Sequence, residues 1–78
     1  MKTYNVWRNG HAPQLIRSEK FLALKTMQKI VGGFIEISQS GKTFFIFDED
    51  GRSKNQEPNN AFPAFVGTVI TTQNGLEK

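Results

Sequence analysis

The sequence predicts an α+β domain in which one helix packs on an antiparallel sheet of four to five strands. Two observations lead to this class. Short segments with apolar and polar residues in alternation, separated by Asn-Gly, Ser-Gly and Asp-Gly turns, are typical of hairpin strands. A single segment, residues 19–31, instead has its apolar residues at helical spacing. The expected order is therefore strand, short strand, helix and three further strands.

Five segments are expected to form the strands, because they combine β-branched or aromatic residues with turn residues at their ends. Pro13 restricts the second of them to an edge of the sheet. The fourth carries phenylalanine or isoleucine on both faces, whereas one helix covers only one face of a sheet. We therefore expect a partner chain to cover the other face. The expected strands are residues 2–8, 14–17, 34–38, 43–47 and 65–72.

The helix is expected to begin after Ser18 as its N-cap and to end at Gly32-Gly33, where glycine commonly stops a helix. Leu22 falls on the outer side of this helix beside two lysines. If the chain docks on another protein, this apolar residue is the expected contact. The inner, apolar face of the helix comprises Ala23, Leu24, Met27, Ile30 and Val31.

Length and composition place these elements in one small domain, residues 1–78, with a polar and frayed end at 73–78. The sequence has no cysteine, so we expect neither a disulfide nor a thiolate zinc site. No apolar run approaches the length of a membrane span, and no signal-peptide pattern follows Lys2. We therefore expect a cytoplasmic protein. A core of this size supplies only about 3–5 kcal/mol of net stability, which favours a homo-oligomer.

No constellation in the sequence predicts catalysis or a metal site. His11 is the single histidine, and no nucleophile or carboxylate is paired with it in the sequence. The acidic run 48–50 partly matches a calcium loop, but Ile46 stands at the first ligand position. A hairpin turn with solvated carboxylates is expected there instead. We expect neither enzymatic activity nor a cofactor.

Binding is the function class that the sequence supports. Asn59 and Asn60 precede an expected helical turn at 61–65, where amides and free backbone N–H groups suit an anionic or amide-bearing ligand. The alternative is that one asparagine only caps this turn. A net charge of +3 neutralises few phosphates of a nucleic acid. The expected ligand-binding residues are Asn59, Asn60, Arg8, His11, Trp7 and Arg52.

Four short motifs follow one another over most of the chain: VGGFIE at 31–36, DEDG at 48–51, PNNA at 58–61 and VGTVI at 66–70. In this order and spacing they resemble a family of small proteins of unknown function that phages and plasmids encode. Phe34 stands where that family usually has tyrosine. The resemblance places any ligand hydrogen bond of that tyrosine in doubt for this chain.

The resemblance implies a non-enzymatic accessory protein, cytoplasmic in a host bacterium, that binds and neutralises a component of host immunity. Sequestration of a nucleotide-derived signal requires only a rigid shell with a few polar contacts. We expect Asn59 and Asn60 of one chain to meet Arg8 or His11 of another at a subunit interface. The alternatives are an inhibitor that docks on a host enzyme and a small nucleic-acid-binding protein.

Overall fold

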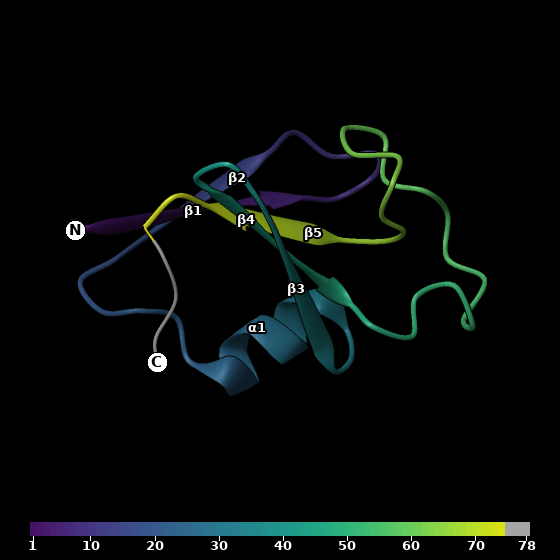
Figure 1. Cartoon of the computed structure of the whole chain (residues 1–78), viewed down its shortest axis with the longest axis horizontal. Coiled ribbons are helices and arrows are strands. Elements are labelled where there is room, and N and C mark those ends of the chain that lie inside the picture. The colour runs from purple at the N-terminus through teal and green to yellow at the C-terminus, as the bar shows by residue number, and fades with distance from the viewer. Residues whose placement is uncertain (75–78) are drawn as a thin grey trace.

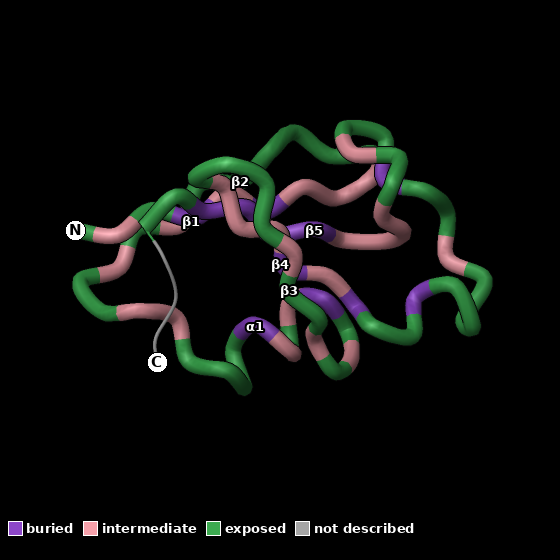
Figure 2. The backbone as a smooth tube through the Cα atoms, in the orientation of Figure 1, coloured by how far each residue is buried: buried purple, intermediate pink, exposed green. Residues whose placement is uncertain are grey.

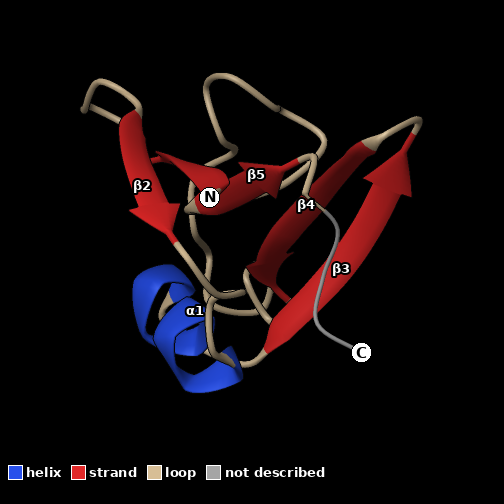
Figure 3. Ribbon diagram, turned by 90° about the vertical axis from the view of Figure 1, so that its left-hand side faces the viewer, coloured by secondary structure: helices blue, strands red, loops and turns tan. Residues whose placement is uncertain are grey.

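A computed structural model describes residues 1–74 and shows one helix packed against a five-stranded antiparallel sheet (Figure 1). This confirms the predicted α+β class. The elements are β1 (Lys2–Trp7), β2 (Gln14–Ser18), α1 (Leu24–Val31), β3 (Ile35–Ser40), β4 (Thr43–Asp48) and β5 (Val69–Thr72). The strand order is β2-β1-β5-β4-β3, so β5 lies at the centre and β2 and β3 form the two edges (Figure 3).

The register of the strands gives the sheet one face of apolar side chains, which α1 covers. Tyr4 lies opposite Ile16 across β1 and β2, and Val6 lies opposite Ile70 across β1 and β5. Figure 2 shows buried segments in β1, β4, β5 and α1. The buried cluster consists of Tyr4, Val6, Met27, Val31, Ile46 and Ile70. The alternation predicted for β1 is therefore confirmed.

The opposite face of the sheet is covered by the chain's own loop between β4 and β5. Phe62 and Phe65 of this loop lie over β4. The ring centroids of Phe45 and Phe62 are 5.3 Å apart, and those of Phe47 and Phe65 are 4.5 Å apart. Trp7 meets Phe62 edge to face at 5.1 Å. This intramolecular cover removes the reason for expecting a partner chain on this face.

The helix begins later than predicted because tertiary contacts fix the segment before it. Ser18 belongs to β2, and its hydroxyl accepts a hydrogen bond from the Lys20 amide instead of capping the helix. The Tyr4 hydroxyl accepts the backbone N–H of Leu22 at 3.1 Å, which holds this segment against the core. Leu22 therefore packs on the core, and its predicted place on the outer side of the helix is wrong. Ala23 is the N-cap and makes no side-chain hydrogen bond.

The end of α1 confirms the predicted glycine stop. Gly32 has a φ of 87°, in the left-handed region, and its N–H donates to the carbonyl of Gln28 at 2.8 Å. Leu24, predicted to lie on the buried face, is the first residue of the helix and is exposed. No helix among residues 1–74 is long and apolar enough to cross a membrane.

The predicted last strand is wrong in its first half, where the chain closes a loop. Gly67 has a φ of 74°, and its N–H donates to the carbonyl of Glu57 at 2.8 Å. Val66 forms an isolated bridge with Pro58. Of the predicted strand at 65–72, only β5, Val69–Thr72, joins the sheet. The predicted helical turn at 61–65 is not a helix, although the Phe65 N–H bonds the carbonyl of Phe62 at 2.9 Å.

The polar end beyond β5 is partly held in place. The Gln73 amide donates to the Thr43 hydroxyl at 3.3 Å, and the Asn74 amide donates to the Thr72 hydroxyl at 2.9 Å. The remainder of the end that we predicted to be frayed, residues 75–78, lies outside the described residues.

Tyr4→Phe is expected to lower the free energy of unfolding by about 1 kcal/mol, because the ring still fills the core while the Leu22 N–H loses its acceptor. Urea denaturation followed by circular dichroism measures this difference. Lys25→Gln, on the exposed side of the helix, is the control and should change stability by less than about 0.5 kcal/mol. Equal stability of Tyr4→Phe and the unaltered chain would show that this bond does not fix the segment.

Candidate ligand-binding site

Five of the six predicted site residues lie together around one cleft of about 310 Å³. They belong to the end of β1, to the β1–β2 turn and to the loop after Pro58, and the turn and the loop lie side by side in the fold (Figure 1). One chain is thus sufficient to bring together the residues that we expected to meet between two chains. The lining of this hairpin cleft consists of Trp7, Arg8, Asn9, Gly10, His11, Pro13, Asn59, Asn60 and Ala61.

Asn9 joins the two walls of the hairpin cleft. Its side-chain nitrogen donates to the carbonyl of Pro58 at 2.8 Å, and its side-chain oxygen accepts the backbone N–H of Asn60 at 2.8 Å. Gly10 completes the turn with a φ of 80°. Sequence reasoning identified Asn9 only as a turn residue, since an Asn-Gly pair carries no sign of a partner fifty residues away.

Asn59 is the buried centre of the loop wall, with only 2% of its surface exposed. Its nitrogen donates to the carbonyls of Trp7 at 3.0 Å and Gly67 at 2.8 Å. Its oxygen accepts the N–H groups of Ala61 at 3.0 Å and Phe62 at 3.1 Å. These four bonds use the whole hydrogen-bonding capacity of the amide. Asn59 therefore caps the turn and holds the cleft, and it offers no group to a ligand.

Arg8, His11 and Asn60 supply the accessible polar groups of the hairpin cleft. One Arg8 nitrogen, Nη1, donates to the side-chain oxygen of Gln14 at 3.0 Å, which leaves other guanidinium donors for a ligand. The side chains of His11 and Asn60 make no hydrogen bond within residues 1–74. Among residues 1–74, no carboxylate lines the cleft, so its electrostatic potential favours an anion.

Trp7 forms a fixed wall of the hairpin cleft. Its indole nitrogen donates to the Thr71 hydroxyl at 2.9 Å, and its ring is held edge-on by Phe62. Trp7 is half-buried as a residue and belongs to the lining of the cleft. A fixed indole can contact a planar group without a large entropy cost.

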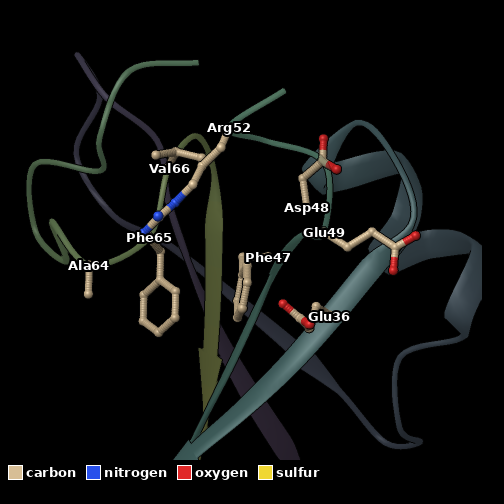
Figure 4. A pocket seen from close by; sticks show the side chains of 8 residues that line it. All are labelled: Glu36, Phe47, Asp48, Glu49, Arg52, Ala64, Phe65 and Val66. Carbon is tan, nitrogen blue, oxygen red and sulfur yellow. The ribbon is translucent and has the colours of Figure 1, made fainter. Parts of the chain in front are cut away.

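Arg52 lies outside the hairpin cleft, in a separate cleft of about 290 Å³ (Figure 4). The rings of Phe47 and Phe65 lie next to each other there, and three carboxylate residues, Glu36, Asp48 and Glu49, share the lining. The structure therefore does not bring Arg52 together with the other five predicted residues. Three carboxylates and one guanidinium in the lining also make this second cleft a poor site for an anion.

In the acidic run at 48–50, Glu49 and Asp50 are exposed turn residues, as expected from the sequence, whereas Asp48 is buried and forms an ion pair, which corrects the expectation for this residue. Asp48 is 2% exposed, and its Oδ2 lies 2.7 Å from Nζ of Lys54. Its Oδ1 accepts the backbone N–H of Asp50 at 2.9 Å. Burial by itself raises the pKa of Asp48, but the hydrogen bonds from Lys54 and Asp50 outweigh it, so the pKa lies below the usual 3.8.

The same ion pair lies against the two glycines that follow the helix, and its closeness explains why residue 33 has no side chain. The Lys54 ammonium also donates to the carbonyl of Gly32 at 3.2 Å, where the helix dipole favours a cation. A Cβ on Gly33 would lie 2.6 Å from the Lys54 nitrogen and 2.9 Å from an oxygen of Asp48. Gly33 is thus required by close packing. Among residues 1–74, no group of three or more His, Cys, Asp or Glu side chains could hold a metal ion.

Asn59→Ala is expected to lower the free energy of unfolding by about 2–4 kcal/mol, more than the loss of an ordinary cap, because four part-buried hydrogen bonds to the backbone are lost together. Asn60→Ala is the matched control and should stay within about 0.5 kcal/mol of the unaltered chain, since this side chain is exposed. Chemical denaturation of both variants tests the assignment. Equal losses would contradict the different roles assigned to the two residues.

Lys54→Met is expected to destabilise the fold by about 1–3 kcal/mol at neutral pH, less than for a fully buried pair because Lys54 is 42% exposed. Asp48 has a lowered folded-state pKa, so its contribution is complete above the unfolded pKa of about 4 and is lost as the pH falls through the folded value. The stability difference between variant and unaltered chain should therefore shrink below about pH 4.

Urea denaturation between pH 2 and pH 7 measures this pH dependence. Lys42→Met, which removes an exposed lysine in the β3–β4 turn, is the control for the change in net charge. If the difference in free energy of unfolding between Lys54→Met and the unaltered chain stays constant with pH, the loss of stability comes from the contact of Lys54 with the helix end and not from its pair with Asp48.

Comparison with known proteins agrees with a family of unknown function. The chain matches the model of a family described as a domain of unknown function, DUF3846, over residues 1–77. No curated protein and no solved structure gives a significant match. Because the family model spans almost the whole chain, the chain belongs to the DUF3846 family.

Proposed function

We propose that this protein is a non-enzymatic binding protein whose hairpin cleft holds a small phosphate-bearing ligand of the nucleotide type. The observation that carries the proposal is the convergence of Arg8, His11 and Asn60 on one cleft that has no carboxylate in its lining within the described part of the chain, residues 1–74. These residues come from two distant segments that Asn9 and Asn59 bond together. Hydrogen bonds between segments distant in the sequence therefore hold the cleft together, and its shape does not depend on the conformation of one loop alone.

The polar groups fit a phosphate better than a neutral ligand. A guanidinium binds phosphate oxygens through two parallel donors, and Arg8 keeps donors beyond the one bonded to Gln14. The His11 ring and the Asn60 amide add donors on the same cleft. Such charge-assisted hydrogen bonds are stronger than bonds between neutral groups.

The aromatic wall and the size of the cleft limit which ligands fit it. The fixed indole of Trp7 offers an apolar surface to a base or another planar group. A volume of about 310 Å³ lies near the lower end of the range for small-molecule sites, roughly 300–1,000 Å³. A ligand of mononucleotide size is favoured over a larger cyclic oligonucleotide.

We propose sequestration as the use of this site. Tight binding without conversion requires no nucleophile or general base, only a rigid cleft of this kind. The resemblance to small phage and plasmid proteins supports a role against a nucleotide signal of host immunity. In this proposal the protein acts in the cytoplasm of the host bacterium.

A thermal shift assay with AMP, ADP-ribose, a cyclic dinucleotide and inorganic phosphate tests the proposed ligand class. At a ligand concentration one hundred times Kd, binding adds about 2.7 kcal/mol to the stability of the folded state. Each kcal/mol raises the Tm of a domain of this size by about 4–8 °C. We expect the largest rise with a mononucleotide-sized ligand.

Variants locate the binding site. Arg8→Ala and His11→Ala should each weaken binding about tenfold or more, because each removes a donor to the phosphate. Arg17→Ala and Arg52→Ala are matched controls that remove an arginine outside the hairpin cleft, and they should leave affinity unchanged. Absence of any shift across the panel would overturn the proposal and favour a host protein as the partner, to be sought as a stoichiometric complex.

A further inference from the structure

The free edge strand β3 is the strongest unassigned interaction feature of this molecule. β2 and β3 lie at opposite edges of the sheet (Figure 3). Pro13 precedes β2 and Arg17 lies within it, and both residue types discourage pairing with another strand. β3 runs for six residues without proline, lysine or arginine. Of the two edges, β3 is therefore the one open to a further strand.

The hydrogen-bonding pattern shows which backbone groups β3 presents at its edge. The Glu49 N–H donates to the carbonyl of Phe34 at 3.0 Å, so the backbone of residue 34 faces β4. Hydrogen-bonded and non-bonded pairs alternate along an antiparallel ladder. Ile35, Ile37 and Gln39 therefore direct their backbone N–H and C=O groups away from β4. Within residues 1–74, no strand pairs with this side of β3.

The side chains along this edge include exposed apolar surface. Ile37, at the middle of β3, is 45% exposed, and Phe34, just before the strand, is 66% exposed. Both are large apolar side chains next to unpaired backbone groups. A strand that pairs with β3 would cover these side chains and bond the three outward backbone units at the same time.

We propose that β3 pairs with β3 of a second copy in the antiparallel register that places the two Ile37 residues opposite each other. This register places Ile35 opposite Gln39, so all three outward units of each strand are bonded. Each Phe34 then lies opposite Ser40 of the second copy, at the two ends of the paired region. The result is one continuous sheet through two copies of the chain.

Charge and packing select this register over its neighbours. A shift by one pair in one direction places Glu36 opposite Glu36, and like charges directly opposite destabilise a pair of strands. A shift in the other direction opposes Ile37 to Gln39, which separates the two exposed isoleucines. Among these registers, only the one centred on Ile37 places the exposed isoleucines opposite each other and places no carboxylate directly opposite another.

Self-pairing of β3 is independent of the proposed ligand. The hairpin cleft lies at the β1–β2 turn, on the other side of the sheet centre from β3. Pairing of two copies therefore leaves both clefts open. A failed ligand panel would not affect this inference, and a monomeric protein would not affect the proposed binding.

A cysteine crosslink tests the register directly, because the natural sequence has no cysteine. In Ile37→Cys the two Cα atoms would be about 5.5 Å apart, within the range of about 4.4–6.8 Å for a disulfide. In the control Gln39→Cys the two cysteines would be offset by four residues, roughly 13 Å, which is too far. We expect mild oxidation to crosslink Ile37→Cys and to leave Gln39→Cys uncrosslinked.

Two variants with opposite charges at residue 37 test the same contact without a covalent bond. By sedimentation, the unaltered chain should have twice the mass of one chain, while Ile37→Lys and Ile37→Glu should each weaken the dimer about tenfold or more. A mixture of the two variants should restore it. Circular dichroism checks that each variant is folded.

Each of three results would overturn the inference. The first is a monomeric unaltered chain at about 100 µM, a concentration far above the Kd of a specific interface. The second is equal crosslinking of the two cysteine variants, which would mean that another surface or register brings the copies together. The third is failure of the Ile37→Lys and Ile37→Glu mixture to associate, which would exclude the register centred on Ile37.

Discussion

The amide of Asn59 is the interaction on which the arrangement around the sheet depends. It bonds the end of β1 at Trp7 to the loop at Gly67, and it caps the turn at residues 61–62. The capped turn places Phe62 against the second face of the sheet, and it places Asn60 beside the β1–β2 turn. One buried amide therefore fixes both the cover of this face and a wall of the hairpin cleft. A buried polar group with every bond satisfied specifies a unique geometry in this way.

The fold was predictable where local signals and tertiary contacts agree. Alternating side chains and Asn-Gly or Ser-Gly turns indicate the hairpins, and the glycine after Val31 indicates the end of the helix. The beginning of the helix was not predictable, because Ser18 resembles an N-cap while the Tyr4–Leu22 bond extends the segment after it. The start of β5 was missed for a similar reason, since residues 65–68 have strand character but close a loop.

The candidate site was predictable as a set of residues but not in their roles. The asparagine pair lies in a loop that lines the hairpin cleft, yet the sequence could not tell which of the two amides is buried. The ion pair of Asp48 could not be predicted because Lys54 lies in a polar segment without periodicity, where a charged residue is expected to be solvated. Long-range partners of turn residues, such as Asn9 with Pro58, leave no pattern in a single sequence.

The central position of β5 has a consequence for how the protein is made. The β1–β2 and β3–β4 hairpins are complete by residue 48, but only β5 joins them into one sheet. During synthesis the nascent chain must therefore keep two unjoined hairpins until residue 72 has left the ribosome. Until then the inner edges of β1 and β4 are open to wrong partners, so formation of the complete sheet is expected to depend on rapid capture of β5.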